Sequence, residues 1–280
     1  MLGQLYDCEP TLSDEQVVDF CRQGMLILER VVPDEINRRA MAFLDDYPDN
    51  RVDEILSEEW FMDAVIKNPQ AAGAVRSLLG KDFRLPLGMS NHRVKTPEAA
   101  QGWHTDGGSI YTPRLDYLQV FYYPQDTPKE LGPLEVVPAS HFARTKANYM
   151  AHYDRIKPGM VTALPAGSII VTVYSIWHRR SRSTAAGLRN MLKYNYWRTS
   201  PPQRDWKTDP QFDFSRANFA TGTPLFEGFR DRPYVAEMFC WLCGLGEFDF
   251  VGGQGWPIVP ETQPGVEQAG MPSALSRDPA

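Results

Sequence analysis

Three residues of this chain have the types and the spacing of a metal site. His104 and Asp106 are two positions apart, and His178 follows 72 positions after Asp106 (178 − 106). Side chains two positions apart on an extended strand lie on the same face of it. Two imidazoles and one carboxylate form the facial triad of a non-haem Fe(II) site, which leaves coordination positions open for chemistry. The sequence therefore predicts that His104, Asp106 and His178 bind iron and form the catalytic centre.

Arg189 follows His178 by 11 positions (189 − 178). A turn and a neighbouring strand would bring its guanidinium back toward the metal. The planar guanidinium can hold a carboxylate through two parallel hydrogen bonds. Arg189 is therefore a candidate for binding a carboxylate close to the metal.

At these residues the chain resembles the phytanoyl-CoA dioxygenase-like family of Fe(II)/2-oxoglutarate oxygenases. That family combines a His-x-Asp pair with a distant His and an Arg 11 residues later, as here. Residues 132–141, GPLEVVPASH, resemble its GPL-x-VVPGSH segment, and residues 12–28 resemble its N-terminal helix and first strand. The resemblance covers roughly residues 10–200. It implies Fe(II), 2-oxoglutarate and O2 as cofactors, with Arg189 on the far carboxylate of 2-oxoglutarate.

The resemblance also implies a reaction, namely hydroxylation of a small organic substrate with release of succinate and CO2. Related halogenases lack the carboxylate ligand and bind chloride in its place, so Asp106 favours hydroxylation. Two other readings stay open. One is a cupin-like metalloenzyme that does not use 2-oxoglutarate, against which Arg189 argues. The other is a catalytically silent ligand-binding β-helix, against which the intact ligand set argues.

Strand parity and the family pattern add further candidate site residues. Asn91 on the preceding strand and Thr105 between the first two ligands are predicted to contact 2-oxoglutarate. Arg180, Trp197 and Tyr111 are predicted to contact the substrate. The family often has a small hydroxyl residue two places after its second His, where this chain has Arg180.

Arg179, Arg180 and Arg182 form a basic cluster just after a metal ligand in an acidic chain. One interpretation is a solvated loop whose arginines balance nearby acids. The other is that one or two of these guanidiniums lie at the mouth of the pocket and bind an anionic group of the substrate. Arg180 is the best candidate, because it has the parity of His178 if the strand continues that far.

The remaining histidines and the cysteine pair have structural interpretations. His92 and His152 have no spacing partner and are predicted to be structural or exposed, and His141 is expected to hydrogen-bond the loop that follows it. Cys240 and Cys243 have a C-x-x-C spacing within an apolar run. Without a second ligand pair, they are expected to be core residues of a helix rather than a zinc or redox site.

Helical patterns come first along the chain and short β-rich runs follow. Capping signals and apolar periodicity predict helices over 13–22, 34–47 and 68–80. Strands are predicted over 25–31, 83–95, 103–106, 115–123, 134–137, 160–164, 168–176 and 189–198. The pattern predicts a mainly β fold with flanking α-helices, a sandwich or jelly roll. The resemblance narrows this to a cupin-like double-stranded β-helix. We expect one domain over 1–251 and a Gly/Pro-rich tail over 252–280.

Composition excludes several function classes. The 280 residues carry a formal net charge of −6, which argues against general nucleic-acid binding. No apolar run approaches the ~18–20 residues that cross a bilayer, and the acidic residues 1–20 lack the pattern of a signal peptide. We expect a cytoplasmic enzyme whose partner is a small molecule, with no membrane or nucleic-acid partner. No segment predicts a particular oligomeric state.

Overall fold

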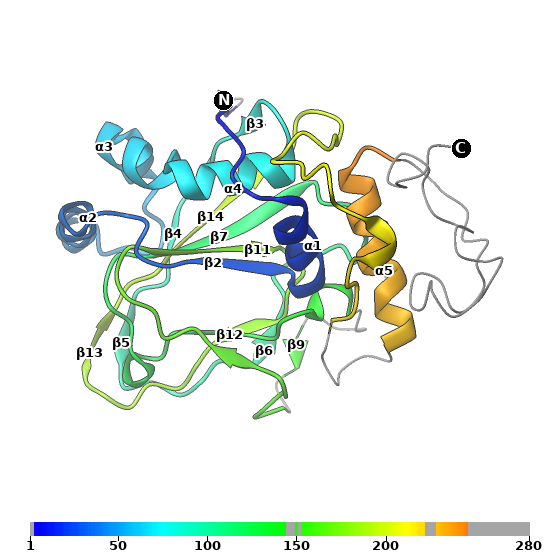
Figure 1. Cartoon of the computed structure of the whole chain (residues 1–280). Helices are drawn as coiled ribbons and strands as arrows, with labels where there is room; N and C mark the ends of the chain where they lie inside the picture. The colour runs from blue at the N-terminus through cyan, green and yellow to red at the C-terminus, as the bar shows by residue number, and fades with distance from the viewer. Residues whose placement is uncertain (1–2, 144–148, 151–152, 222–227, 246–280) are drawn as a thin grey trace.

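The computed structural model describes residues 3–143, 149–150, 153–221 and 228–245. Two β-sheets face each other (Figure 1). Helix α4 lies along the outer side of the larger sheet, with α2 and α3 near one end and α1 and α5 near the other (Figure 1). This arrangement is the jelly roll that the alternation of short strands predicted.

The larger sheet provides one wall of the metal site. Its strands run in the order β1 (Leu5–Tyr6), β3 (Phe83–Arg84), β14 (Leu192–Trp197), β7 (Tyr117–Tyr123), β11 (Ser168–Val173) and β2 (Met25–Leu28), and β4 (Ser90–Asn91) also pairs with β14. The pairs are antiparallel, and the register places Asn195 and Thr172 on either side of Gln119.

The smaller sheet provides the opposite wall. Its order is β10 (Met160–Val161), β8 (Leu134–Val136), β12 (His178–Arg180), β6 (Trp103–His104) and β9 (Tyr149–Met150). A separate two-stranded ribbon pairs β13 (Gly187–Arg189) with β5 (Val94–Thr96). These strands are short, so each strand pair brings only one to three residues of each strand opposite one another.

The helices are α1 (Asp14–Gln23), α2 (Asp34–Asp46), α3 (Glu59–Phe61), α4 (Pro69–Leu79) and α5 (Gly228–Leu242), with a π-helical turn at Met62–Ile66. Short 3-10 turns occupy Asp53–Ser57, Lys129–Leu131, Ser140–Phe142 and Phe214–Arg216. Helix α1 begins with the capping box of Ser13 and Gln16 that the sequence predicted.

Alternation along the central strands divides the interior into two parts. Leu118, Val120 and Tyr122 of β7 belong to the large core that also contains the helices. Phe121 and Tyr123, on the opposite face of the same strand, belong to a smaller core between the two sheets. The strand is thus buried on both faces, and only its inner face can contribute to a site between the sheets.

The predicted fold class is confirmed, whereas several predicted strand boundaries were wrong. The predicted strand over 83–95 is three short strands, β3, β4 and β5, and the predicted strand over 189–198 is divided between β13 and β14. The predicted tail, 252–280, lies outside the described residues, so the domain boundary at 251 stays a prediction.

The cysteine pair is part of the packing between helices. Cys240 is buried on α5 and Cys243, just after it, is half-buried. Burial raises the pKa of both thiols, which keeps them protonated and poorly reactive.

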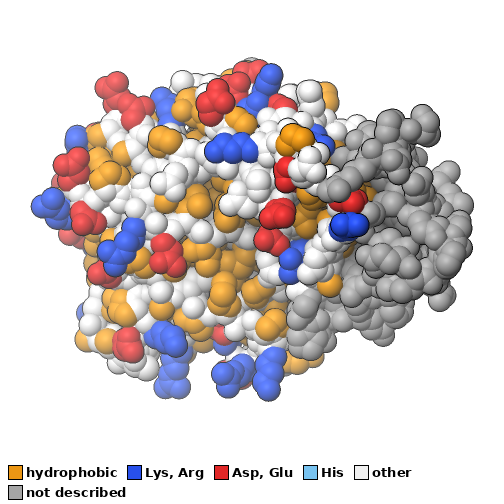
Figure 2. Space-filling model, in the orientation of Figure 1, with side chains coloured by type: hydrophobic (Ala, Val, Ile, Leu, Met, Phe, Trp, Pro, Cys, Tyr) orange, Lys and Arg blue, Asp and Glu red, His pale blue; other side chains and the backbone are white. Residues whose placement is uncertain are grey.

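The surface carries charges of both signs. Acidic and basic side chains are interspersed with apolar ones on the face shown in Figure 2. Among the described residues, no helix is both long and apolar enough to cross a membrane.

Candidate metal centre

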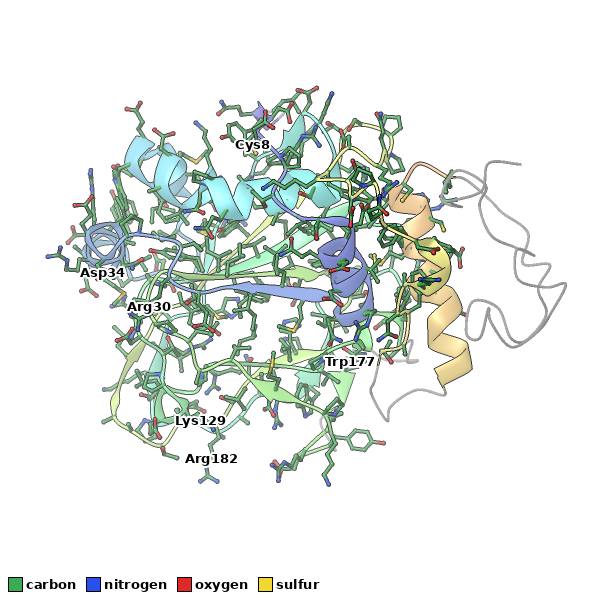
Figure 3. All side chains as sticks on the ribbon, in the orientation of Figure 1. Cys8, Arg30, Asp34, Lys129, Trp177 and Arg182 are labelled. Atoms are coloured by element: carbon green, nitrogen blue, oxygen red, sulfur yellow. The ribbon has the colours of Figure 1, made fainter. Side chains whose placement is uncertain are left out.

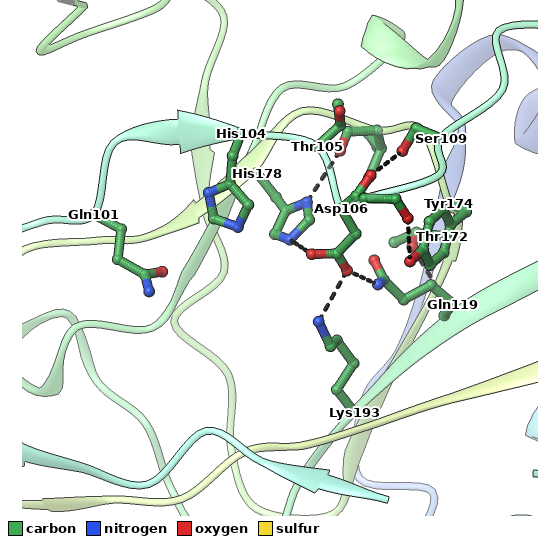
Figure 4. A network of polar contacts seen from close by, with 12 residues as sticks. Gln101, His104, Thr105, Asp106, Ser109, Gln119, Thr172, Tyr174, His178 and Lys193 are labelled. Atoms are coloured by element: carbon green, nitrogen blue, oxygen red, sulfur yellow. Dashed lines mark hydrogen bonds and ion pairs between the residues drawn. The ribbon is translucent and has the colours of Figure 1, made fainter. Parts of the chain in front are cut away.

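The three predicted ligands meet between the two sheets. The metal-binding atoms of His104, Asp106 and His178 all lie within 4.8 Å of one another. Strands β6 and β12 pair so that His104 lies directly opposite His178, and the centroids of their imidazole rings are 4.5 Å apart. Asp106 follows β6 and turns its Oδ1 toward His178, 3.9 Å from Nε2 (Figure 4).

Backbone carbonyls fix which nitrogen of each imidazole faces the metal position. His104 Nδ1 lies 2.9 Å from the carbonyl oxygen of Gly102, and His178 Nδ1 lies 3.0 Å from that of Ile176. A carbonyl oxygen can only accept, so both Nδ1 atoms carry the hydrogen. The Nε2 lone pairs are therefore free for a metal, as is usual for histidine ligands. Burial also lowers the pKa of His178 to about 4, which keeps the ring neutral near pH 7.

The second oxygen of Asp106 is held by the larger sheet. Gln119 Nε2 of β7 and Lys193 Nζ of β14 both donate to Oδ2, with Lys193 at 2.9 Å (Figure 4). Burial alone would raise the pKa of Asp106, but His178, Lys193 and these hydrogen bonds outweigh it and lower the pKa to about 2. Asp106 is therefore ionised, with Oδ1 left to bind a metal.

Arg189 is buried deep between the sheets. Its side chain is 1% exposed, and its only hydrogen-bond acceptor among the described residues is Met191 Sδ, 3.2 Å from Nη2. Nε and Nη1 are buried and have no partner. Burial, together with the nearby charge of Arg180, lowers the pKa of Arg189 to about 10, and the guanidinium stays charged near pH 7. Unpartnered charged donors in such a place indicate a missing anionic ligand.

His92 connects the surroundings of Arg189 to the metal site. It lines the same pocket as Arg189, and its electrostatic neighbours include Lys193 and Asp106. Burial and the nearby cations lower the pKa of His92 to about 3, so the ring is neutral. His92, predicted to be structural or exposed, is half-buried in this pocket wall, and His152 lies outside the described residues.

The residues predicted to contact the cosubstrate lie nearby. Asn91 lines the Arg189 pocket, and its amide nitrogen donates to Asn190 Oδ1 at 2.9 Å while its own Oδ1 is buried and unpartnered. Thr105 is buried, and its hydroxyl lies 3.3 Å from the hydroxyl of Tyr111. Their roles stay predictions.

The predicted substrate residues are placed apart from one another. Tyr111 is half-buried in the loop that follows Asp106. Trp197 is half-buried at the end of β14, opposite Tyr117 of β7 and on the same face as Lys193. Arg180 instead lines the pocket around Arg189.

Each arginine of the basic cluster has a different environment. Arg179 pairs with Glu135, with Nε 2.7 Å from Oε2, and stacks on the ring of Trp103. Arg182 is exposed and projects away from the body of the molecule (Figure 3). The interpretation as a solvated loop therefore suits only Arg182, because Arg179 of β12 balances Glu135 in a buried ion pair and Arg180 is half-buried against the pocket.

Two residues that hold Asp106 were not assigned to the site from the sequence. Gln119 is a polar residue within an otherwise apolar strand segment, and it is fully buried. A single polar residue between buried apolar ones is the sequence signal that could have indicated a buried hydrogen bond at Gln119. Lys193 has the parity of Arg189, but its contact with Asp106 depends on the register between β14 and β7.

The donor set fits Fe(II) with a chelating 2-oxo acid. Two neutral imidazoles and one ionised carboxylate with one free oxygen are the ligands of a non-haem iron site. The buried guanidinium of Arg189 supplies the charge and the unpartnered N–H groups that the far end of a dicarboxylate needs.

Comparison with protein-family models agrees with this geometry. Residues 8–191 match the model of the phytanoyl-CoA dioxygenase family. The chain belongs to this family. The match covers all three metal ligands and Arg189, and it establishes an oxygenase of the iron- and 2-oxoglutarate-dependent type. No curated protein shows a significant match to the chain.

Solved structures of the same fold include HygX from Streptomyces hygroscopicus with nickel and 2-oxoglutarate bound. It is 16% identical, with a TM-score of 0.55 over 68% of this chain and 88% of that chain. The epimerase SnoN, in complex with Fe3+, alpha ketoglutarate and nogalamycin RO, is 16% identical with a TM-score of 0.53 over 66% and 83% of the two chains. The carbocyclase SnoK from nogalamycin biosynthesis is 19% identical with a TM-score of 0.52 over 71% and 90%. At these identities the likeness establishes the fold alone.

Proposed function

We propose that this protein is an Fe(II)- and 2-oxoglutarate-dependent hydroxylase of a small organic molecule. The observation that carries the proposal is a two-His, one-carboxylate site that shares its interior with a buried arginine whose Nε and Nη1 have no partner. The guanidinium can bind the far carboxylate of a chelated dicarboxylate, which favours 2-oxoglutarate over a metalloenzyme that does not use it.

When bound together, iron, 2-oxoglutarate and O2 supply the oxidation. In the overall reaction, one oxygen atom of O2 would enter a substrate C–H bond, the other would enter succinate, and the keto-acid carboxylate would be released as CO2. The protein supplies binding and orientation. His104, Asp106 and His178 would hold the metal, with Gln119 and Lys193 on Asp106 Oδ2, and the far carboxylate would bind in the Arg189 pocket.

Two features support the reaction type and the substrate class. Asp106 occupies the ligand position that chloride takes in halogenases, which favours hydroxylation. HygX has also been crystallised with hygromycin B, and SnoN with nogalamycin RO. Small natural products therefore fit this fold, and we assign a substrate of that size to this chain.

The test is succinate release from 2-oxoglutarate with Fe(II) and O2, followed by analysis of a substrate screen with isotopically labelled O2. We expect succinate from the parent and labelled oxygen in the hydroxylated product. His178→Ala should release no succinate. Its urea midpoint of unfolding should stay close to that of the parent, which would show that the variant is folded. Succinate release that is unchanged in His178→Ala would place the chemistry elsewhere, and a desaturated product would correct the reaction type.

A further inference from the structure

The pocket around Arg189 has unbalanced positive charge. It has a volume of about 320 Å³, and its charged walls are Arg93, Arg180 and Arg189, with no Asp or Glu among the residues that line it. Arg93 pairs with Asp45, 3.1 Å from Nη2 to Oδ1. Arg180 and Arg189 form no ion pair with any residue that the structure describes. Neither guanidinium is therefore neutralised by a direct ion pair, and Glu98 acts on Arg180 only as a nearby charge outside the pocket lining.

The nitrogens of these two guanidiniums also lack acceptors. Nη1 of Arg180 is buried without a hydrogen-bond partner, as are Nε and Nη1 of Arg189. The two charges are close enough for Arg180 to act electrostatically on Arg189. Buried, charged donors without acceptors are costly, and like charges in one pocket add to that cost. Both side chains line one pocket, so an anion bound there has donors from both within the same walls.

Local structure holds Arg180 in this position. Within β12, His178 faces the metal site and Arg180 has the same parity, while Arg179 between them faces away and pairs with Glu135. Gln101 fixes the backbone at this point. Its Oε1 accepts from the amide N–H of Arg180 at 3.0 Å, and its own N–H donates to the carbonyl of Arg180 at 3.0 Å. The strand therefore places the half-buried side chain of Arg180 along the pocket wall, with Nη1 buried.

We infer that Arg180 is a second cosubstrate residue, which binds the far carboxylate of 2-oxoglutarate together with Arg189. The family often has a small hydroxyl at this position, so this chain uses a guanidinium where a neutral donor is common. The inference rests on the proposed function, because it names a further residue of the same site. Under this inference Arg180 contacts 2-oxoglutarate and not, as was predicted from the sequence, the substrate.

A consequence is strong selection for a dicarboxylate. A 2-oxo acid without the far carboxylate would keep the keto-acid end that chelates iron but would leave Arg180 and Arg189 in one pocket without an anion. Each guanidinium binds a carboxylate through charge-assisted hydrogen bonds, so both contribute to the preference.

The test compares two 2-oxo acids on the Fe(II)-loaded protein without O2, by calorimetry. The first is 2-oxoglutarate, and the second is 2-oxobutanoate, which has the same keto-acid end and no far carboxylate. The variants are Arg180→Gln and Arg180→Ser, and the matched control is Arg182→Gln, which removes the same charge from an exposed residue two positions later.

We expect both Arg180 variants to lose ~10- to 100-fold in affinity for 2-oxoglutarate, as for one charge-assisted contact. Arg182→Gln should stay within roughly twofold of the parent, and no variant should change 2-oxobutanoate binding by more than roughly twofold. Unchanged 2-oxoglutarate binding in Arg180→Gln would overturn the inference, and so would an equal loss for both acids. If the parent itself binds neither acid, the proposed function fails instead.

Thermal unfolding separates this role from a structural one. Without ligand, Arg180→Gln removes one of two repelling charges, so its melting temperature should equal or exceed that of the parent. Added 2-oxoglutarate should raise the melting temperature of the variant less than that of the parent. A lower melting temperature without ligand, combined with an undiminished ligand-induced rise, would make Arg180 structural and overturn the inference.

Discussion

Replacement of Gln119 by Met should weaken iron binding without weakening the fold. Gln119 is fully buried and donates to Asp106 Oδ2, while its own Oε1 is buried and has no partner. Met has a similar size and shape but lacks both polar atoms. The change therefore removes one hydrogen bond to the carboxylate and also removes one unsatisfied acceptor.

The two effects on stability nearly cancel. A hydrogen bond to a charged group contributes ~1.5–3 kcal/mol, and an unsatisfied buried acceptor costs ~1–3 kcal/mol. We therefore expect the free energy of unfolding of the metal-free protein to change by less than about 1 kcal/mol.

The affinity for iron has no second effect that would offset the lost hydrogen bond. Outer hydrogen bonds to metal ligands are typically worth ~10- to 100-fold in metal affinity. Lys193 remains on the same oxygen at 2.9 Å, so the lower end of that range, about tenfold, is expected.

The assay is anaerobic Fe(II) calorimetry beside urea unfolding of the metal-free protein. Thr172→Val is the matched control, because Thr172 lies opposite Gln119 on β11 and donates to its backbone carbonyl at 3.1 Å. It should keep the iron affinity of the parent. Iron affinity in Gln119→Met within roughly twofold of the parent, a difference below ~0.5 kcal/mol, would refute the reasoning.

Three further outcomes are expected. Arg189→Lys keeps the charge but loses the planar fork, so 2-oxoglutarate should bind about tenfold more weakly in calorimetry; an unchanged affinity would move the anchor elsewhere. Burial holds the pKa of His141 at about 4 against 6.5 in the unfolded chain, so the folded state binds fewer protons and stability falls as the pH drops from 6.5 to 4. His141→Gln should flatten that fall in urea titrations at several pH values, by up to about 3 kcal/mol, and an unaltered slope would contradict the assignment. With chloride and a turned-over substrate, mass spectrometry should find hydroxylated and no chlorinated product, because Asp106 occupies the position that chloride would take.

The metal centre could be predicted from the sequence because its geometry is mostly local. The His-x-Asp spacing puts His104 and Asp106 on one side of the chain in an extended segment, and the type and position of His178 complete the set. The structure brings these three together and buries Arg189 in a pocket that it shares with His92.

Parity predicted which residues of this segment share a face, but not what that face contacts. A continuous strand over 83–95 would keep Asn91 and Arg93 on one face, and they do share one, because both contact Asn190 Oδ1. Both residues line the Arg189 pocket, Arg93 also reaches α2 and pairs with Asp45 there, and His92 between them is an electrostatic neighbour of Asp106. The choice between two faces depends on packing, which the alternation alone does not contain.

Contacts between strands distant in sequence could not be predicted from spacing. Gln119 and Lys193 meet at Asp106 Oδ2 only because β7 and β14 pair in one particular register. His141 likewise binds backward to the carbonyl of Cys21 in α1, at 3.0 Å, rather than to the loop that follows it, so that expectation was wrong. For Arg180, strand parity predicted a side chain on the same face as His178, but it did not predict that the side chain lines the pocket of Arg189.

The most direct test of the central claim is the visible charge-transfer absorption of an Fe(II)–2-oxo acid chelate, recorded without O2. The parent protein with Fe(II) should develop this band when 2-oxoglutarate is added. Arg189→Lys should develop it only at higher 2-oxoglutarate concentrations, and His104→Ala should not develop it at all. A parent protein that binds Fe(II) at this site yet shows no band at saturating 2-oxoglutarate would contradict the assignment of these residues to an iron and 2-oxoglutarate centre.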